Sequence, residues 1–376
     1  MDGQSVVMES KVPALQAQLT GVLSVRDVQV LEQPDRVVSF SGRLLRDAES
    51  AYEALRERFH ALGYTPSLQR QGESEVVIAQ RGVITTQPSR VWINLALFIA
   101  TLLATLLTGA VNEVGQMVMN EEMIVPALLN RPILLLSGLP FALTIMSILL
   151  AHEMGHYIMG RRYNAPVSLP YFIPMPLVTP FGTMGAVIVQ RAPFENRKSL
   201  FDIGVAGPLA GMVVALPLLI YGLATSHVGP IQPPALLEGN SILYLTVKYL
   251  IFGRILPGNG VDVMLNPIAW AAWGGLLVTA LNLMPIGQFD GGHTLYAVLG
   301  RRAWPIAMGV VALLVAMGFL WPGWFIWALL ALVFGARHPA PLNDLSPLDG
   351  KRRLVGIGVL ILFVLIFTPI PITAIQ

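Results

Sequence analysis

The chain has 376 residues, of which 54% are hydrophobic and only 12% are charged, with a formal net charge of +2. Soluble domains carry charges on about 25% of their residues, so this composition favours a membrane protein with several spans. So small a net charge gives no support to nucleic-acid binding. The chain has no cysteine, which excludes disulfides and thiolate ligands; a metal would need His, Asp, Glu or water.

Residues 1–88 are polar and predict a small soluble α+β domain. A ββαββ order is indicated by segments at 28–31, 36–45, 48–62, 68–71 and 75–79. Asp47 can cap the helix, Gly63 can end it, and Gly72 suits the hairpin turn. The region lacks a signal-peptide core and a transit-peptide composition, so we expect it on the cytoplasmic side. Any regulatory element of this chain would lie here, and gating, partner binding and fold stabilisation all remain open as its role.

Residues 89–373 predict the transmembrane domain. A helical crossing takes about 20 apolar residues. Candidate crossings are 91–111, 132–160, 203–225, 263–284, 303–320, 324–336 and 354–372. The fifth and sixth come from one uncharged run, which we divide at Trp321-Pro322-Gly323-Trp324 because Pro-Gly favours a turn and tryptophan suits the membrane interface.

The distribution of Lys and Arg supports this topology. With the N-terminus inside, the outer loops carry only Arg131, Lys248 and Arg254, so the positive-inside rule is satisfied. We therefore expect an α-helical polytopic membrane protein with about seven transmembrane helices and a small N-terminal α+β domain. Segment 241–256 is predicted to be interfacial or re-entrant. Segment 165–190, with five prolines, is predicted to be irregular or β-type backbone at the inner face.

The second apolar run ends in ionisable residues, His152-Glu153-Met154-Gly155-His156. Residues four apart share a helix face, so both imidazoles can reach one cation, and Glu153 can act as general base on metal-bound water. Each ionisable group inside a membrane segment costs about 2.5–3.5 kcal/mol on insertion scales, which favours a functional role. The alternative is a polar cluster satisfied inside a helix bundle.

A catalytic zinc site usually has three protein ligands, so a third is expected on another helix. Asp290 is the only carboxylate between Asp262 and Asp344, and it follows the apolar run that ends at the same face as His152. The glycines after Asp290 allow close approach of the backbone. Asn282 could orient a substrate carbonyl or oxyanion. A turn aspartate and a helix–helix hydrogen bond are the structural alternatives for Asp290 and Asn282.

At these residues the sequence resembles the site-2 protease family of intramembrane zinc metalloproteases, over about residues 90–350. The specific parts are His152-Glu153-Met154-Gly155-His156 and Asn282, Pro285 and Asp290-Gly291. Supporting parts are Gly182-Thr183-Met184-Gly185-Ala186 and Ala206-Gly207-Pro208-Leu209-Ala210-Gly211. The passage from residue 169 to 205 is similar to the branch with cyanobacterial and chloroplast members.

This resemblance implies one zinc ion per chain, bound by His152, His156 and Asp290, with Glu153 as catalytic acid/base. It implies peptide-bond hydrolysis within or near a transmembrane segment of a membrane-anchored substrate, in regulated intramembrane proteolysis after a first cut by another protease. We expect a multi-pass protein in the lipid bilayer of a prokaryotic plasma membrane, with its active site near the cytoplasmic side. No nucleic-acid partner is expected, and the oligomeric state stays open.

The sequence also gives expectations for four further positions. Gly182 and Gly185 are expected to help hold an extended substrate. His293 could support the metal site, face the substrate, or make a hydrogen bond at a helix start. His338 is expected to be a loop histidine.

Several alternatives remain open at this point. Segment 226–262 is too short for an inserted PDZ domain, and the C-terminus shows no cystathionine-synthase-type module, so both depart from some family members. A metalloprotease with a different third ligand, a transporter with broken helices, and an inactive scaffold are the rival functions. A His₂-carboxylate set also suits iron.

Overall fold

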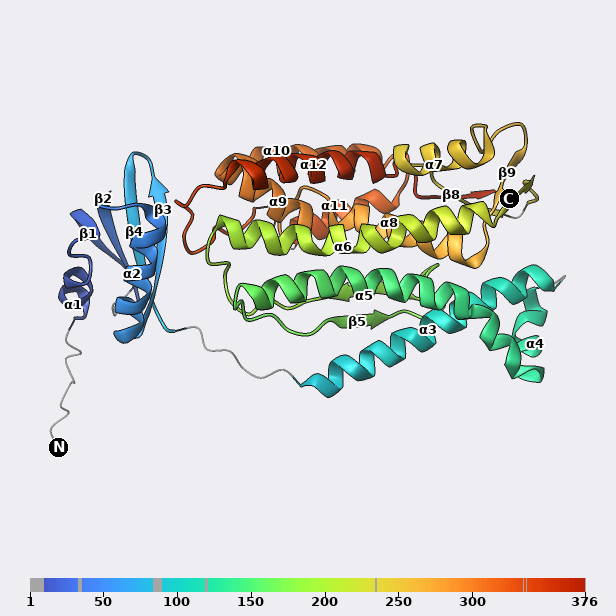
Figure 1. Cartoon of the computed structure of the whole chain (residues 1–376), viewed down its shortest axis with the longest axis horizontal. Coiled ribbons are helices and arrows are strands. Elements are labelled where there is room, and N and C mark those ends of the chain that lie inside the picture. The colour runs from blue at the N-terminus through green and yellow to red at the C-terminus, as the bar shows by residue number, and fades with distance from the viewer. Residues whose placement is uncertain are drawn as a thin grey trace. The chain divides into compact units, whose positions relative to one another are not determined.

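The computed structural model describes residues 10–32, 36–83, 90–118, 121–233, 235–333, 335 and 337–375. The chain folds as two compact units (Figure 1). The N-terminal unit comprises residues 10–83 together with two later segments, Arg191–Leu200 and Pro339–Gly350. The membrane unit comprises the remaining described residues from 90 onward. The predicted domain boundary between residues 88 and 89 lies outside the described residues.

The N-terminal unit is built on a four-stranded antiparallel sheet in the order β1-β2-β4-β3. Its elements are α1 (Val12–Ala17), β1 (Leu23–Glu32), β2 (Val37–Leu44), α2 (Ala48–Ala61), β3 (Tyr64–Gln71) and β4 (Ser74–Arg81). Asp47 accepts hydrogen bonds from the amides of Glu49 and Ser50, and Gly63 follows α2 with φ of +80°. The predicted ββαββ module is therefore confirmed, and α1 is an addition to it.

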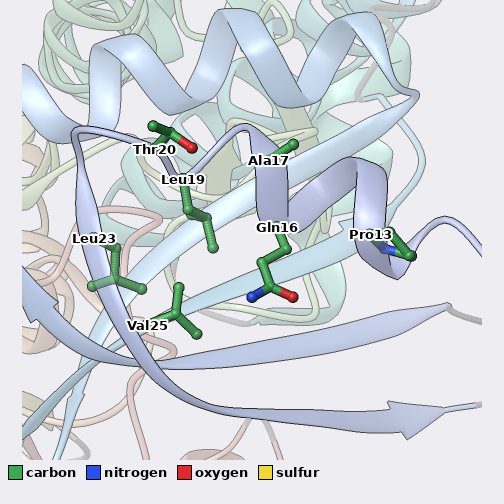
Figure 2. A pocket seen from close by; sticks show the side chains of 7 residues that line it. All are labelled: Pro13, Gln16, Ala17, Leu19, Thr20, Leu23 and Val25. Atoms are coloured by element: carbon green, nitrogen blue, oxygen red, sulfur yellow. The ribbon is translucent and has the colours of Figure 1, made fainter.

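A pocket of about 410 Å³ lies between α1 and β1 in the N-terminal unit (Figure 2). Its lining consists of Pro13, Gln16, Ala17, Leu19, Thr20, Leu23 and Val25. None of these side chains ionises, so this pocket offers no acid, base or charged ligand for catalysis.

Four helical stretches of the described residues are long and apolar enough to cross a membrane. They are Val91–Met117 (α3), Pro132–Arg162 (η2, Pro132–Gly138, and α5, Leu139–Arg162), Arg197–Ala224 (α6) and Asp290–Met317 (α9, Asp290–Leu299, η3, Gly300–Arg302, and α10, Ala303–Met317). The three other predicted runs contain the shorter helices α8 (Pro267–Asn282), α11 (Gly323–Val333) and α12 (Gly350–Ile366). The structure thus agrees with a helical polytopic membrane protein, and α10 and α11 are separate helices on either side of Trp321.

Short elements connect these helices. They are η1 (Glu121–Met123), α4 (Ile124–Asn130), α7 (Ile242–Phe252) and three two-stranded sheets. The sheets pair β5 (Tyr171–Pro174) with β6 (Thr183–Val187), β7 (His227–Pro230) with β9 (Val261–Met264), and β8 (Ala235–Glu238) with β10 (Ile372–Ile375). The β-type backbone predicted for residues 165–190 is confirmed by β5 and β6. The other two sheets were not predicted.

Glycines allow α5 to pack closely against its neighbours. Figure 1 shows α5 and α6 side by side, and a Cβ at Gly155 of α5 would overlap the carbonyl of Ala206 of α6. On the α8 side, a Cβ at Gly275 would lie 2.7 Å from the side chain of Ile148. These contacts bring the start of α6 and the end of α8 to the polar end of α5.

Candidate metal centre

The two histidines of α5 face the same point, as their spacing predicts. Nε2 of His152 lies 3.2 Å from Nε2 of His156. The side chain of His152 is 4% exposed and that of His156 is 13% exposed. The helix thus holds two imidazoles together in a nearly dry environment.

Asp290 reaches the same point from α9, of which it is the first residue. Its Oδ2 lies 3.2 Å from Nε2 of His152 and 3.3 Å from Nε2 of His156. The N-terminal end of a helix favours a carboxylate there. The backbone at Gly291 approaches the carbonyl of Leu283 so closely that a Cβ would overlap it. The turn from α8 into α9, which positions Asp290, therefore requires glycine.

These three atoms form a nearly equilateral triangle with sides of 3.2–3.3 Å. Tetrahedral zinc with bonds of about 2.0–2.1 Å has ligand atoms about 3.3 Å apart, so the set fits such an ion. Nδ1 of His156 lies 2.7 Å from the carbonyl oxygen of Ile203, which can only accept. The proton is therefore on Nδ1, and Nε2 of His156 turns a lone pair toward the centre of the site.

Two polar side chains border this triangle. Glu153 follows His152 on α5 and is 4% exposed. The amide nitrogen of Asn282, at the end of α8, lies 3.3 Å from Nε2 of His152. A carboxylate and an amide therefore accompany a largely buried set of three candidate metal ligands, which is the composition expected of a hydrolytic metal site.

The sequence matches peptidase family M50 over residues 140–321, a range that includes all three candidate ligands. Over this range, which is just under half of the chain, the sequence is similar to the site-2 protease family. The resemblance drawn from His152, His156 and Asp290-Gly291 is thereby confirmed at the level of the family.

Curated relatives of this chain include plant proteins. It is 31% identical over 243 residues to the probable chloroplastic zinc metalloprotease EGY1 of Oryza sativa subsp. japonica, covering 62% of this chain and 41% of that protein. It is 30% identical over 243 residues to the probable chloroplastic zinc metalloprotease EGY2 of Arabidopsis thaliana, covering 63% and 43%. The chain thus spans less than half of the length of these relatives. No solved structure matches it.

Other predicted residues lie elsewhere. Gly182 has φ of +71° and packs against α3, where a Cβ would meet Thr108. Gly185 has φ of +99° and open space on its Cβ side. His293 lies one turn after Asp290, and its Nδ1 is 2.6 Å from Nε2 of His338. The structure therefore gives His293 a hydrogen bond to another histidine.

Four residues at the site were given no role there from the sequence: Ile203, His338, Gly207 and Gly211. Ile203 contributes a backbone carbonyl, for which no sequence signal exists. His338 lies in a loop, as predicted, and it is also 9% exposed and contacts His293, which the sequence did not predict. Gly207 packs against His156, and Gly211 packs against His152. The spacing of Gly207 and Gly211, four residues apart on one helix, was the available signal.

Proposed function

We propose that this protein is an intramembrane zinc metalloprotease that hydrolyses peptide bonds within or near the transmembrane segments of membrane-anchored proteins. One observation carries the proposal: Nε2 of His152, Nε2 of His156 and Oδ2 of Asp290 converge within 3.3 Å of one another, in helices that can span a membrane. The plant relatives that are named probable zinc metalloproteases support the same activity.

The roles of the site residues follow from their chemistry. Zinc bound by the three ligands would supply Lewis acidity and make water a nucleophile near neutral pH. Glu153 takes the proton of the attacking water and returns it to the leaving amine. Asn282 offers an N–H donor at the edge of the site for charge developing on the scissile carbonyl. Ile203 holds the ring of His156 in one orientation and one tautomer.

The β5–β6 hairpin is the proposed guide for the substrate. A peptide bond inside a helix is not accessible to a nucleophile, so the substrate must be extended near the site. Among the described residues β6 pairs only with β5, which leaves its other edge to add an extended strand. Since the chain has no native cysteine, single cysteines across residues 182–190 can be cross-linked to cysteines in a substrate. No cross-links anywhere in that range would contradict this role.

The proposed membrane arrangement comes from the charge distribution. Seven crossings would place residues 10–83 and the loops rich in Lys and Arg at the cytoplasmic face, with the active site near that face. The proposed setting is a prokaryotic plasma membrane, and the proposed substrate is a regulator already cut by another protease. Alkylation of single introduced cysteines by a membrane-impermeant reagent, from either side, would test the crossings.

The test of the function combines metal content with cleavage. Zinc is measured by mass spectrometry on detergent-purified wild type, Glu153→Gln and Asp290→Ala, and cleavage is measured on a model transmembrane substrate. We expect about one zinc per chain in wild type and Glu153→Gln, less in Asp290→Ala, and cleavage only by wild type. Wild type that binds no metal and cuts nothing would favour a scaffold or a transporter instead. Zinc without cleavage would leave the metal site standing and argue against this substrate in its uncut form.

A further inference from the structure

Two segments that connect membrane helices are built into the N-terminal sheet. At the edge of β3, the amide of Leu68 donates to the carbonyl of Leu342 at 2.6 Å, and the amide of Asp344 donates to the carbonyl of Leu68 at 3.0 Å. On the other side, the amide of Asn343 donates to the carbonyl of Glu195 at 2.8 Å. Residues 342–344 therefore act as an added strand between β3 and the segment that precedes α6.

Side chains strengthen this attachment within the same unit. Asn343 is 1% exposed, and its Nδ2 donates to the carbonyl of Ala48 at 2.9 Å and to the hydroxyl of Ser346 at 2.7 Å. Three ion pairs add to it: Arg56 with Glu195 at 3.0 Å, Lys198 with Glu49 at 2.9 Å, and Arg197 with Asp344 at 2.9 Å. Helix α2 and strand β3 thus hold both segments by backbone hydrogen bonds, by the side-chain amide of Asn343 and by ion pairs.

Just beyond each held segment, the chain contacts a proposed metal ligand or a residue one turn away from one. Ile203, three residues after Leu200, accepts the hydrogen bond from His156. His338 immediately precedes Pro339, and it bonds to His293 one turn after Asp290. His338 also stacks on Tyr296, with ring centroids 4.7 Å apart.

An ion pair lies just beyond the other end of segment 339–350, next to the contact between Ile203 and His156. Arg352, two residues after Gly350, donates from Nε and Nη2 to the carboxylate of Asp202 at 2.8 and 2.7 Å. Asp202 is the neighbour of Ile203 in α6. A paired Arg–carboxylate of this bidentate kind fixes orientation as well as distance. The start of α12 is therefore tied to the turn of α6 that orients His156.

We propose that the N-terminal unit influences the geometry of the metal site through the chain connections that lead to Ile203, His338 and Arg352. Releasing residues 191–200 and 339–350 from the sheet would then weaken metal binding. This inference rests on the proposed function. His338, Asp202 and Arg352 act as positioning residues: they touch the elements that carry the ligands rather than the ligands' donor atoms. The residues of a metal site must be held within about 0.5 Å of their productive positions. A small displacement of α6 or α9 is therefore enough to lower the affinity for zinc.

The test uses the full chain in detergent. Hydrogen exchange of residues 191–200 and 339–350 reports their release from the sheet, and competition with a chelator reports the zinc dissociation constant.

Asn343→Ala removes the buried amide; it is expected to raise exchange in both segments and weaken zinc binding at least tenfold. Arg56→Glu and Glu195→Arg each break an exposed ion pair and are expected to weaken binding two- to fivefold, with the double reversal back within twofold of wild type. Glu57→Arg, an exposed reversal on α2, is the matched control and should change neither quantity.

The outcomes separate the two proposals. Faster exchange with an unchanged zinc dissociation constant would overturn this inference and leave the protease proposal standing. Unchanged exchange in Asn343→Ala would contradict the attachment itself. If Asn343→Ala does not fold, the charge-reversal cycle decides, because its double variant restores the pair. Wild type that binds no zinc would overturn the proposed function and this inference with it.

Discussion

Gly207 of α6 lies so close to the imidazole of His156 that a Cβ at this position would overlap Nε2. The atoms nearest to such a Cβ all belong to the imidazole ring, so we expect the ring to be displaced from the triangle of candidate ligands. We therefore expect Gly207→Ala to weaken zinc binding at least tenfold, measured by chelator competition. The control is Gly309→Ala in α10, where a Cβ meets nothing within 4 Å. Equal zinc affinity in both variants would show that His156 has more room than this packing implies.

Asn282 is expected to act on the reaction rather than on metal retention. Loss of one donor to a developing oxyanion lowers kcat by about 10²–10³-fold, so Asn282→Ala should lose activity on that scale while keeping its zinc. Asn266→Ala is the control, because Asn266 caps the opposite end of α8 by accepting from the amide of Ala269. Loss of zinc from Asn282→Ala would instead assign the amide to positioning His152.

Lys248 is a buried cation between two carboxylates, and its removal is expected to destabilise the fold. Its Nζ lies 3.0 Å from Asp262 and 3.3 Å from Glu238, and its side chain is 0% exposed. Lys248→Met leaves both buried carboxylates without their cation, which should lower the free energy of unfolding by about 3–5 kcal/mol. Lys198→Met, at a lysine paired with an exposed glutamate, should lower it by about 1 kcal/mol or less. Denaturant unfolding in detergent measures both, and similar losses would argue against a strongly buried cluster.

Glu238 is expected to make stability depend on pH. Burial raises the pKa of Glu238 from its ordinary value of 4.5, although Lys248 opposes the shift. The folded state therefore holds this proton more tightly than the unfolded state, so the free energy of unfolding falls as pH rises from 4.5 toward the raised pKa. Glu238→Gln should remove that component and flatten the curve of Tm against pH. The control is Glu57→Gln, at an exposed glutamate, whose curve of Tm against pH should be parallel to that of wild type. If the curve of Glu238→Gln is also parallel to that of wild type, the prediction is contradicted.

The parts of the structure that sequence predicted best depend on local pattern. Asp47 and Gly63 mark the ends of α2 because capping and positive φ are properties of single residues. The spacing of His152 and His156 placed them together because an α-helix repeats every 3.6 residues. Asp290 could be added because no other carboxylate competes for the position.

What sequence did not predict depends on contacts between distant residues. The pairing of Leu68 with residues 342–344 leaves no periodic signal, because an edge strand accepts almost any backbone. The sheets β7–β9 and β8–β10 join short segments for the same reason. His338 was missed since only the folded chain brings it to His293. Ile203 was missed because every residue has a carbonyl.

The added strand also bears on how the chain is made. Synthesis proceeds from the N-terminus, so β3 is complete long before residues 342–344 leave the ribosome. Until then the edge of β3 offers unpaired amides and carbonyls, a surface on which chains can pair wrongly. Residues 10–83 are thus translated before the membrane helices but completed only when residues 342–344 follow, and a chain truncated before residue 342 would display an open sheet edge to cellular quality control.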